Sequence, residues 1–401
     1  MDDPQFDPFD PALAEDPYPV YATMREQHPV YRSAAGYWVL FRHEDCAAVM
    51  LDRRFGHGSQ SRKDLGSWSD GLDSASARTD RYPLFFAAMD PPDHTRIRRA
   101  AAQWFTPRAM DRLEPRIHHL ADALVTTAVE KGECDLLSEV GVPLSLGVLG
   151  EILGIPVTDR EQFQVWVSHF IRGLDPSWTK TEGESAQRVR AQEEMAAYFH
   201  ELVARRRSRP GTDLISVLAA PDSQLTEDEV YGTCVLLLVT GFESTTQLVG
   251  NGMHALLRNP GELARLRADP GLVGTAVEEL LRFAPPAAYT IRTALQDTEF
   301  AGRHIAERER LLVLILAANR DPDVFRDPDE LDIARDPNPH IAFGGGIHHC
   351  LGAPLTRIEG RIVLGTLLAR ASRIDLTADT LVPCQNILKR GFERVPVSMR
   401  A

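Results

Sequence analysis

A glycine-rich loop that ends in a single cysteine and runs into a helix constrains this chain more than any other stretch. The loop, FGGGIHHCLG, spans residues 343–352, and the residues from Ala353 onward have the apolar spacing of a helix. Cys350 is therefore expected where the N–H groups of an opening helical turn point toward its sulfur and favour a thiolate. The glycines allow tight turns and the close approach of a flat ligand, which suits a cysteinate bound to a metal in a planar cofactor.

Two simpler interpretations of this cysteine compete with a cofactor site. Taken alone, Cys350 would be a buried structural cysteine, as most lone intracellular cysteines are. A zinc site built from His348, His349 and Cys350 is weaker, because zinc sites usually need four ligands at characteristic spacings and the chain has no Cys-x-x-Cys pair.

The whole loop resembles the haem-ligand loop of the cytochrome P-450 family. That pattern is Phe, two residues, Gly, one residue, Arg or His, one residue, Cys, one residue, Gly. Its five places are held here by Phe343, Gly346, His348, Cys350 and Gly352. The resemblance implies that Cys350 is the iron ligand of haem b (iron protoporphyrin IX), and that the loop, with Gly344, binds this cofactor.

Length and composition favour one cytoplasmic domain. The 401 residues contain no Gly/Ser linker or repeat, so a single domain over residues 1–401 is expected. A net charge of −13 argues against a nucleic-acid partner, and five scattered cysteines indicate a reducing compartment. Residues 1–20 lack the features of a signal peptide, and the apolar runs are shorter than the roughly 20 residues that cross a bilayer, so no membrane association is expected.

A long helix is predicted over about residues 226–258, within a mainly helical stretch that begins near residue 109. Thr226 and Glu229 form a capping box, and the apolar run 235–239 predicts a buried middle. The polar cluster TGFESTTQ follows directly at residues 240–247. Its glycine and hydroxyl residues favour a local opening of the helix that admits water. A polar turn packed against another helix is the alternative.

The polar cluster resembles the family's central-helix motif over the haem: Ala or Gly, Gly, any residue, Asp or Glu, Thr. Gly241 and Glu243 fit this motif. Thr240 replaces the small residue, Ser244 replaces the usual Thr, and Thr245 follows. The resemblance implies that Glu243, Ser244 and Thr245 relay protons to oxygen at the haem. Because serine is smaller and less constrained than threonine, weaker coupling of oxygen use to product formation is expected.

Three further segments match the family. His94 and Arg98 are four residues apart after DPPD, a spacing that alone is more often a solvated helix face. DPPDHTRIRR resembles the segment whose His and Arg bind haem propionates, and the resemblance gives the same role to Arg292 and His348. A Glu-x-x-Arg pair at 279 and 282 would otherwise read as a surface salt bridge; the resemblance implies a structural role without direct catalysis.

Candidate residues for a substrate pocket come from four places in the chain. Residues 84–86 are unusually apolar for the end of a long loop, and local core packing is the alternative there. The others lie in the central helix, in a predicted strand at 287–294 and in a turn near the C-terminus. The candidates are Phe85, Phe86, Val239, Thr240, Ala287, Tyr289, Thr290, Ile387 and Leu388.

Together these segments resemble a bacterial soluble cytochrome P-450 over almost the whole chain. The resemblance implies a mainly α fold with a small β region, and a haem-thiolate monooxygenase that uses O2 to hydroxylate or epoxidise a small organic molecule, with a secondary metabolite expected. The chain has no dinucleotide fingerprint, so electrons are expected from a separate ferredoxin and ferredoxin reductase, and a monomer is expected. An oxidative coupling or peroxide-driven enzyme and a haem-binding sensor or carrier are the alternatives.

Overall fold

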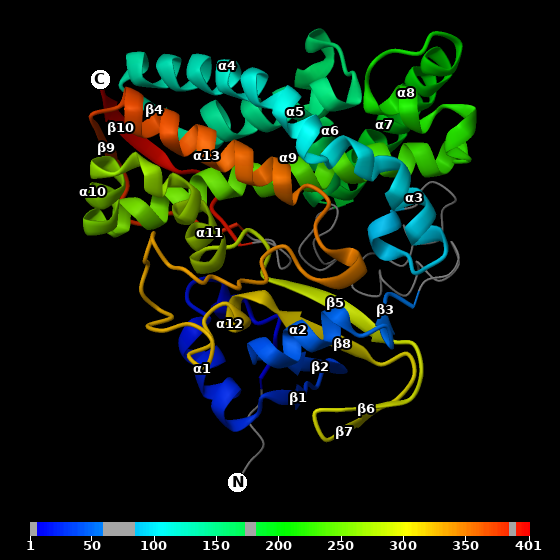
Figure 1. The fold of residues 1–401 in the computed structure, drawn as a ribbon, viewed down its shortest axis with the longest axis vertical. Coiled ribbons are helices and arrows are strands. Elements are labelled where there is room, and N and C mark those ends of the chain that lie inside the picture. Colours follow the sequence, from blue (N-terminus) through cyan, green and yellow to red (C-terminus); the bar gives the residue numbers. More distant parts are fainter. Residues whose placement is uncertain (1–5, 59–84, 173–181, 385–389) are drawn as a thin grey trace. The chain divides into compact units, whose positions relative to one another are not determined.

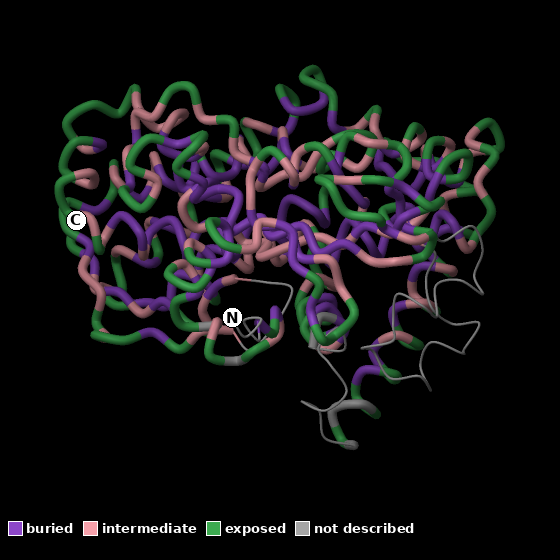
Figure 2. The backbone as a smooth tube through the Cα atoms, turned by 90° about the horizontal axis from the view of Figure 1, so that it is seen from below, coloured by how far each residue is buried: buried purple, intermediate pink, exposed green. Residues whose placement is uncertain are grey.

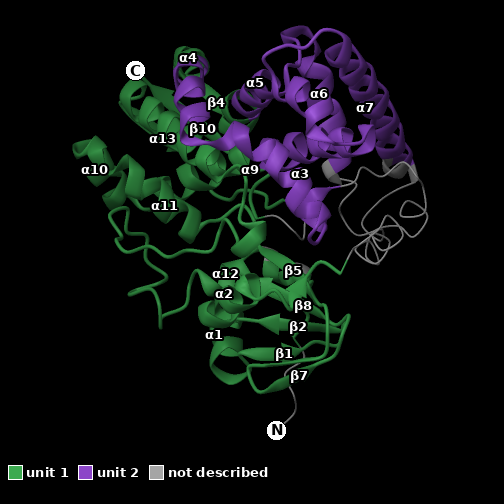
Figure 3. Ribbon diagram, turned by 45° about the vertical axis from the view of Figure 1, so that its right-hand side comes forward, with its two compact units in different colours: residues 1–58, 121–141, 244–401 green, residues 59–120, 142–243 purple. Residues whose placement is uncertain are grey.

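The computed structural model describes the chain in four stretches, residues 6–58, 85–172, 182–384 and 390–401 (Figure 1). The chain divides into two compact units: unit 1 (residues 1–58, 121–141 and 244–401) and unit 2 (residues 59–120 and 142–243), coloured separately in Figure 3. Two helices, α4 (Pro107–Lys131) and α9 (Glu227–Arg258), contribute residues to both units.

Unit 2 is helical throughout its regular structure in the described residues. Aromatic rings join two of its helices: Phe163 of α6 packs edge-on against Tyr198 and Phe199 of α7, with ring centroids 4.9 and 5.5 Å apart. The helices that belong wholly to this unit are α3 (Asp93–Ala102), α5 (Val142–Leu153), α6 (Arg160–Arg172), α7 (Glu182–Ser208) and α8 (Leu214–Leu218). The helical character predicted for residues after 109 is confirmed.

Unit 1 contains three small sheets. The largest has the order β1-β2-β8-β5-β3 and consists of β1 (Val30–Arg32), β2 (Tyr37–Leu40), β8 (Arg310–Leu314), β5 (Tyr289–Ala294) and β3 (Phe55–Gly56). Strands β2 and β8 are parallel, and the other pairs in this sheet are antiparallel. The smaller sheets are β4 (Glu133–Asp135) with β10 (Pro396–Arg400) and β9 (Arg373–Leu376), and β6 (Thr298–Phe300) with β7 (Arg303–Ile305).

Both faces of the five-stranded sheet are covered by helices. Successive side chains of each strand point to opposite faces, so they join two different buried clusters. Along β8, Leu311 and Val313 belong to one buried cluster, which α2 (His43–Leu51) completes. Leu312 and Leu314 point to the opposite cluster, which α1 (Tyr18–Gln27) completes. The other helices of unit 1 are α10 (Pro260–Ala268), α11 (Val273–Phe283), α12 (Ile315–Ala318) and α13 (Ala353–Arg370).

The predicted central helix is α9. The capping box is confirmed: the Thr226 N–H donates to Glu229 Oε2 (2.9 Å), and the Glu229 N–H donates to Thr226 Oγ1 (3.3 Å). Residues 229–239 are all buried. Figure 2 shows in purple the buried parts of the described chain. Among the described helices, only α9 is long and apolar enough to cross a membrane, and 78% of that apolar window is buried, as expected for a core helix.

The expected local opening of α9 is wrong for this structure, because the helix continues without interruption through residues 240–247. Two hydroxyl groups in this stretch are satisfied without breaking the helix. The Thr240 hydroxyl donates to the Leu236 carbonyl one turn earlier (2.7 Å), and Thr245 donates to a side chain of another helix, described below.

The Glu279–Arg282 pair on α11 is fully buried rather than solvated, with both side chains 0% exposed. Two parallel hydrogen bonds of 2.7 Å join the guanidinium to the carboxylate. The guanidinium also donates to three backbone carbonyls of the coil 319–330, those of Asn319, Pro328 and Glu330. The expected structural role is confirmed: the pair holds the coil that leads to the cysteine loop.

We predict that Arg282→Met destabilises the protein by about 3–5 kcal/mol, because it leaves a buried carboxylate and three backbone carbonyls without their main donor. Urea unfolding should detect this as a lower midpoint. Arg326→Met is the matched control, since that side chain is 94% exposed and should change the midpoint little. Equal midpoints for the two variants would contradict the role given to Arg282.

Candidate functional site

Cys350 lies where the glycine-rich loop meets α13. Its N–H donates to the Phe343 carbonyl (2.8 Å), which closes the loop, and Gly352 is the N-cap residue of the helix. The thiol is exposed, whereas Cys46, Cys134 and Cys234 are buried. The interpretation of Cys350 as a buried structural cysteine is therefore wrong, and the predicted loop-to-helix junction is confirmed.

The loop packs so closely against the end of α2 that it requires glycine. Gly344 and Gly346 have φ angles of 68° and 64°, in the left-handed region that favours glycine. A Cβ at Gly346 would lie 2.4 Å from the Met50 carbonyl oxygen, a distance that real Cβ atoms do not reach. Any other residue at 346 would push the loop away from α2 and move Cys350 with it.

His57, which no sequence pattern marked, lies beside one predicted propionate ligand, His348, and close in the sheet to the strand that carries another, Arg292. The His57 ring packs edge-on against the His348 ring, with centroids 4.5 Å apart. His57 directly follows β3, whose Gly56 pairs with Thr293 next to Arg292. Arg292 is buried, and its guanidinium donates to Thr290 Oγ1 (3.1 Å). The position of His57 near the candidate site follows from the pairing of β3 with β5, and no local sequence motif indicates it.

The other two predicted propionate ligands, His94 and Arg98, lie one turn apart on α3 in unit 2. His94 is buried and Arg98 is half-buried, so this face of the helix is not the solvated face that the spacing alone would suggest. The Phe86 ring packs against the His94 ring, with centroids 6.2 Å apart.

The polar cluster of α9 includes a contact that the sequence did not predict. Glu243 and Ser244 are half-buried, and Thr245 is fully buried. The Thr245 hydroxyl donates to Glu359 Oε2 on α13 (2.7 Å), and Glu359 is only 2% exposed. Glu359 follows Cys350 by nine positions in the sequence, a spacing with no recognisable helical or metal motif, so only the packing of α13 on α9 reveals the contact.

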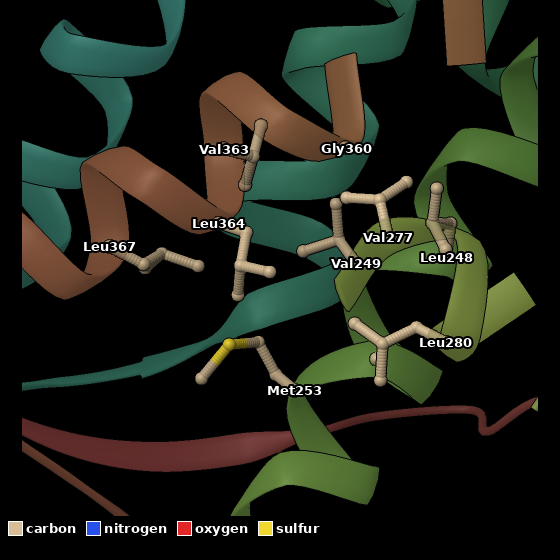
Figure 4. A pocket seen from close by; sticks show the side chains of 10 residues that line it. Leu248, Val249, Met253, Val277, Leu280, Gly360, Val363, Leu364 and Leu367 are labelled. Carbon is tan, nitrogen blue, oxygen red and sulfur yellow. The ribbon is translucent and has the colours of Figure 1, made fainter. Parts of the chain in front are cut away.

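Burial makes Glu359 a weak acid. Desolvation raises its pKa to about 8, although the hydrogen bond from Thr245 lowers it in part. A small apolar pocket of about 20 Å3 lies alongside, lined by residues that include Leu248, Gly360 and Val277 (Figure 4). This pocket could hold one water molecule by volume, but its lining has no polar group to bind that water. The pocket therefore does not hydrate the Glu359 carboxyl group. It is also far too small for an organic substrate.

The candidate pocket residues are placed in different surroundings. Phe85 packs against the Phe170 ring, with centroids 6.0 Å apart. Tyr289 packs with Ile291 in the buried cluster beside α1, on the face of β5 opposite Thr290 and Arg292. Tyr289 and Thr290, both candidates for the pocket wall, therefore point to opposite faces of β5.

The remaining pocket candidates divide by burial. Ala287 packs against the cluster beside α2, Val239 is buried, and Thr240 is exposed on α9. Ile387 and Leu388 lie outside the described residues.

The residues fit the cofactor that the sequence implies. Haem presents one iron and two propionates, which call for a thiolate and for guanidinium or imidazole donors. Unit 1 alone supplies the exposed Cys350 thiol at a helix start, together with a guanidinium (Arg292) and an imidazole (His348), the kinds of group that bind a carboxylate. Bound through Cys350, haem would supply the activation of O2, which electron donation from a thiolate sulfur promotes. Among the described residues, no cluster of three or more His, Cys, Asp or Glu side chains suits a metal ion such as zinc.

Comparison with known proteins agrees with this geometry. Residues 271–379 match the model of the cytochrome P450 family. The chain is 36% identical to cytochrome P450 monooxygenase PikC of Streptomyces venezuelae, over 97% of this chain and 92% of that protein. The myxobacterial cytochrome P450 CYP267B1, solved with myristic acid, matches with a TM-score of 0.88 at 38% identity, over 98% of both chains.

A third relative was solved with a protein partner. P450BioI, in complex with hexadec-9Z-enoic acid ligated acyl carrier protein, matches with a TM-score of 0.86 at 34% identity, over 97% of this chain and 99% of that one. The chain therefore belongs to the cytochrome P450 family. It has the cytochrome P450 fold, mainly α with a small β region, its cofactor is haem, and it is an oxidoreductase of the monooxygenase type.

We predict that Glu359→Gln removes a pH dependence of folding stability. The carboxyl group has a pKa of 4.5 when unperturbed and about 8 in the folded protein. Between these values the folded state keeps a proton that the unfolded state has lost. Wild-type stability should therefore fall as the pH rises, by up to about 1.4 kcal/mol per pH unit, and the fall should be complete above the folded pKa.

Urea unfolding of both proteins from about pH 5 to about pH 9 measures this difference. The variant should gain stability relative to the wild type across that range. Glu299→Gln, at a side chain that is 73% exposed, is the control and should leave the wild-type pH dependence unchanged. Parallel stability curves for the wild type and Glu359→Gln would contradict a raised pKa at this site.

Proposed function

We propose that this cytochrome P450 hydroxylates or epoxidises a small organic secondary metabolite, with Cys350 as the iron ligand. The observation that supports this most directly is the exposed Cys350 thiol at the start of α13, on a loop whose glycines pack against α2. Phe343, Gly344 and Gly352 shape the same loop. We assign binding of the haem propionates to Arg292, His348, His94 and Arg98.

Proton delivery is assigned to the polar cluster of α9. Glu243 and Ser244 are half-buried there, so water reaches both side chains. Thr245 is different, because its hydroxyl donates to Glu359. We therefore propose that the Ser244 hydroxyl takes part in proton delivery to O2 at the haem. Thr245 instead fixes the α9 backbone through its hydrogen bond to Glu359 of α13.

The substrate class is proposed from the relatives. PikC is named a monooxygenase, CYP267B1 was solved with a fatty acid, and P450BioI was solved with an acyl chain on a carrier protein. A panel for optical titration should therefore include free polyketide, terpenoid and fatty-acid compounds and an acyl carrier protein conjugate. A low-to-high-spin change with one compound would identify the class. We propose a monomeric cytoplasmic enzyme that takes electrons from a ferredoxin and its reductase.

We predict that Cys350→Ala abolishes the red-shifted Soret band that a thiolate-ligated haem shows with carbon monoxide after reduction. The alanine variant has no sulfur to bind iron, whereas Cys134→Ala, at a buried cysteine in β4, should keep the band. Circular dichroism of both variants checks that the fold is intact. Retention of the band in Cys350→Ala would overturn the proposed function.

We predict that Ser244→Ala leaves haem binding intact but lowers the product formed per NADPH by several-fold, because alanine can neither donate nor accept a hydrogen bond. Product and NADPH consumption are measured together with a ferredoxin system and, separately, with peroxide. Ser244→Thr is the matched variant and should raise coupling by adding the more constrained hydroxyl. Unchanged coupling in Ser244→Ala would remove Ser244 from the proton relay.

A further inference from the structure

Two neighbouring acids on α11, Glu278 and Glu279, bind different partners. Glu278 belongs to a charged cluster with Arg357 and His340. Glu279 faces Arg282, as described above. Glu278 instead binds Arg357 of α13 in a fork, with Nε to Oε1 at 2.7 Å and an Nη to Oε2 at 2.8 Å. His340 also contacts Glu278 through Nε2 (3.2 Å).

Glu278 is an anion at working pH. Burial alone would raise its pKa, but the hydrogen bonds from His340 and Arg357 outweigh burial and lower the pKa to about 2. Arg357 is therefore a cation paired with a fixed anion. The side chains are partly exposed, Arg357 by 37% and Glu278 by 29%, so water screens the pair without removing its field.

The fork holds the Arg357 guanidinium over the ring of Phe343, 4.5 Å from its centroid. Phe343 is the residue whose carbonyl accepts the Cys350 N–H. The pKa of Arg357 is raised mainly by its hydrogen bonds to Glu278. The cation therefore stacks on the residue whose carbonyl holds the Cys350 N–H.

We propose that Arg357 is a positioning residue that weakens the electron donation of Cys350, and that Glu278 sets how strongly it does so. This inference rests on the proposed role of Cys350 as the iron ligand. A positive charge near a thiolate stabilises electron density on the sulfur, so less of it reaches the metal. The reduced iron, which carries one more negative charge, is then favoured, and the reduction potential is higher than it would be without Arg357.

Arg357 and Glu278 carry opposite charges, so removing one or the other should shift the haem midpoint potential in opposite directions. Arg357→Gln removes the cation and should shift the midpoint potential of the haem to lower values. Glu278→Gln leaves the cation without its anion and should shift the potential to higher values. A merely loosened loop would shift both variants in the same direction, because both break the same fork.

The stretching frequency of carbon monoxide on the reduced haem gives a second readout that does not depend on turnover. Stronger donation from sulfur increases back-donation from iron to carbon monoxide, so the frequency should fall in Arg357→Gln and rise in Glu278→Gln. Spectroelectrochemical titration and infrared spectroscopy on substrate-free protein measure the two quantities on the same samples.

Two arginine variants separate charge from packing. Arg357→Lys keeps the charge but cannot form the planar fork, and should stay closer to the wild type than Arg357→Gln does. Arg361→Gln removes an exposed charge from the same helix one turn later and should leave both readouts unchanged. If Arg357→Lys shifts as far as Arg357→Gln, or if Glu278→Gln shifts in the same direction, the proposal is overturned.

Failure of this inference is distinguishable from failure of the proposed function. If Cys350 is not the iron ligand, the wild-type protein itself will lack the thiolate-type band with carbon monoxide. If Cys350 is the ligand and Arg357 has no electrostatic role, that band will be present in every variant and the potentials of Arg357→Gln and Glu278→Gln will not diverge.

Discussion

The buried ion pair of Glu279 and Arg282 is the interaction on which the rest of unit 1 depends. A charged pair without contact with water is tolerated only when its remaining hydrogen-bonding positions are also satisfied. Here those positions are filled by backbone groups of the coil 319–332 and by Arg335, which donates to the Glu279 carboxylate. The pair therefore gives an irregular segment a defined path, and that path leads into the loop of Cys350.

The cysteine loop is held from several independent directions. The preceding coil is anchored where Asn319 Oδ1 accepts the Ile341 N–H (2.9 Å). Glycine packing against Met50 determines how closely the loop approaches α2, and the Phe343 carbonyl orients the Cys350 N–H. From α11, Glu278 reaches the loop through Arg357. One helix thus supports both the approach to the loop and the electrostatics around its sulfur, through adjacent acids that point to different partners.

Much of this organisation could be predicted from local sequence. The helix after Ala353 and the capping box of α9 both depend on neighbours within a few residues, and both are present in the structure. The expected opening of α9 failed because the prediction counted glycine and hydroxyl groups without knowing their partners. The Thr245 hydroxyl binds Glu359 on α13, 114 residues away in the sequence, and the helix is continuous at this point.

The sequence by itself determined the class of protein and the residue types of the site, because the order and spacing of Phe343, Gly346, His348, Cys350 and Gly352 within one loop form a specific local pattern. Tertiary structure alone decided which groups meet. Strand pairing placed His57 beside His348, sheet alternation turned Tyr289 away from Arg292, and helix packing buried Glu359 and raised its pKa. Burial and long-range pairing depend on elements far apart in the chain, so no local pattern carries that information.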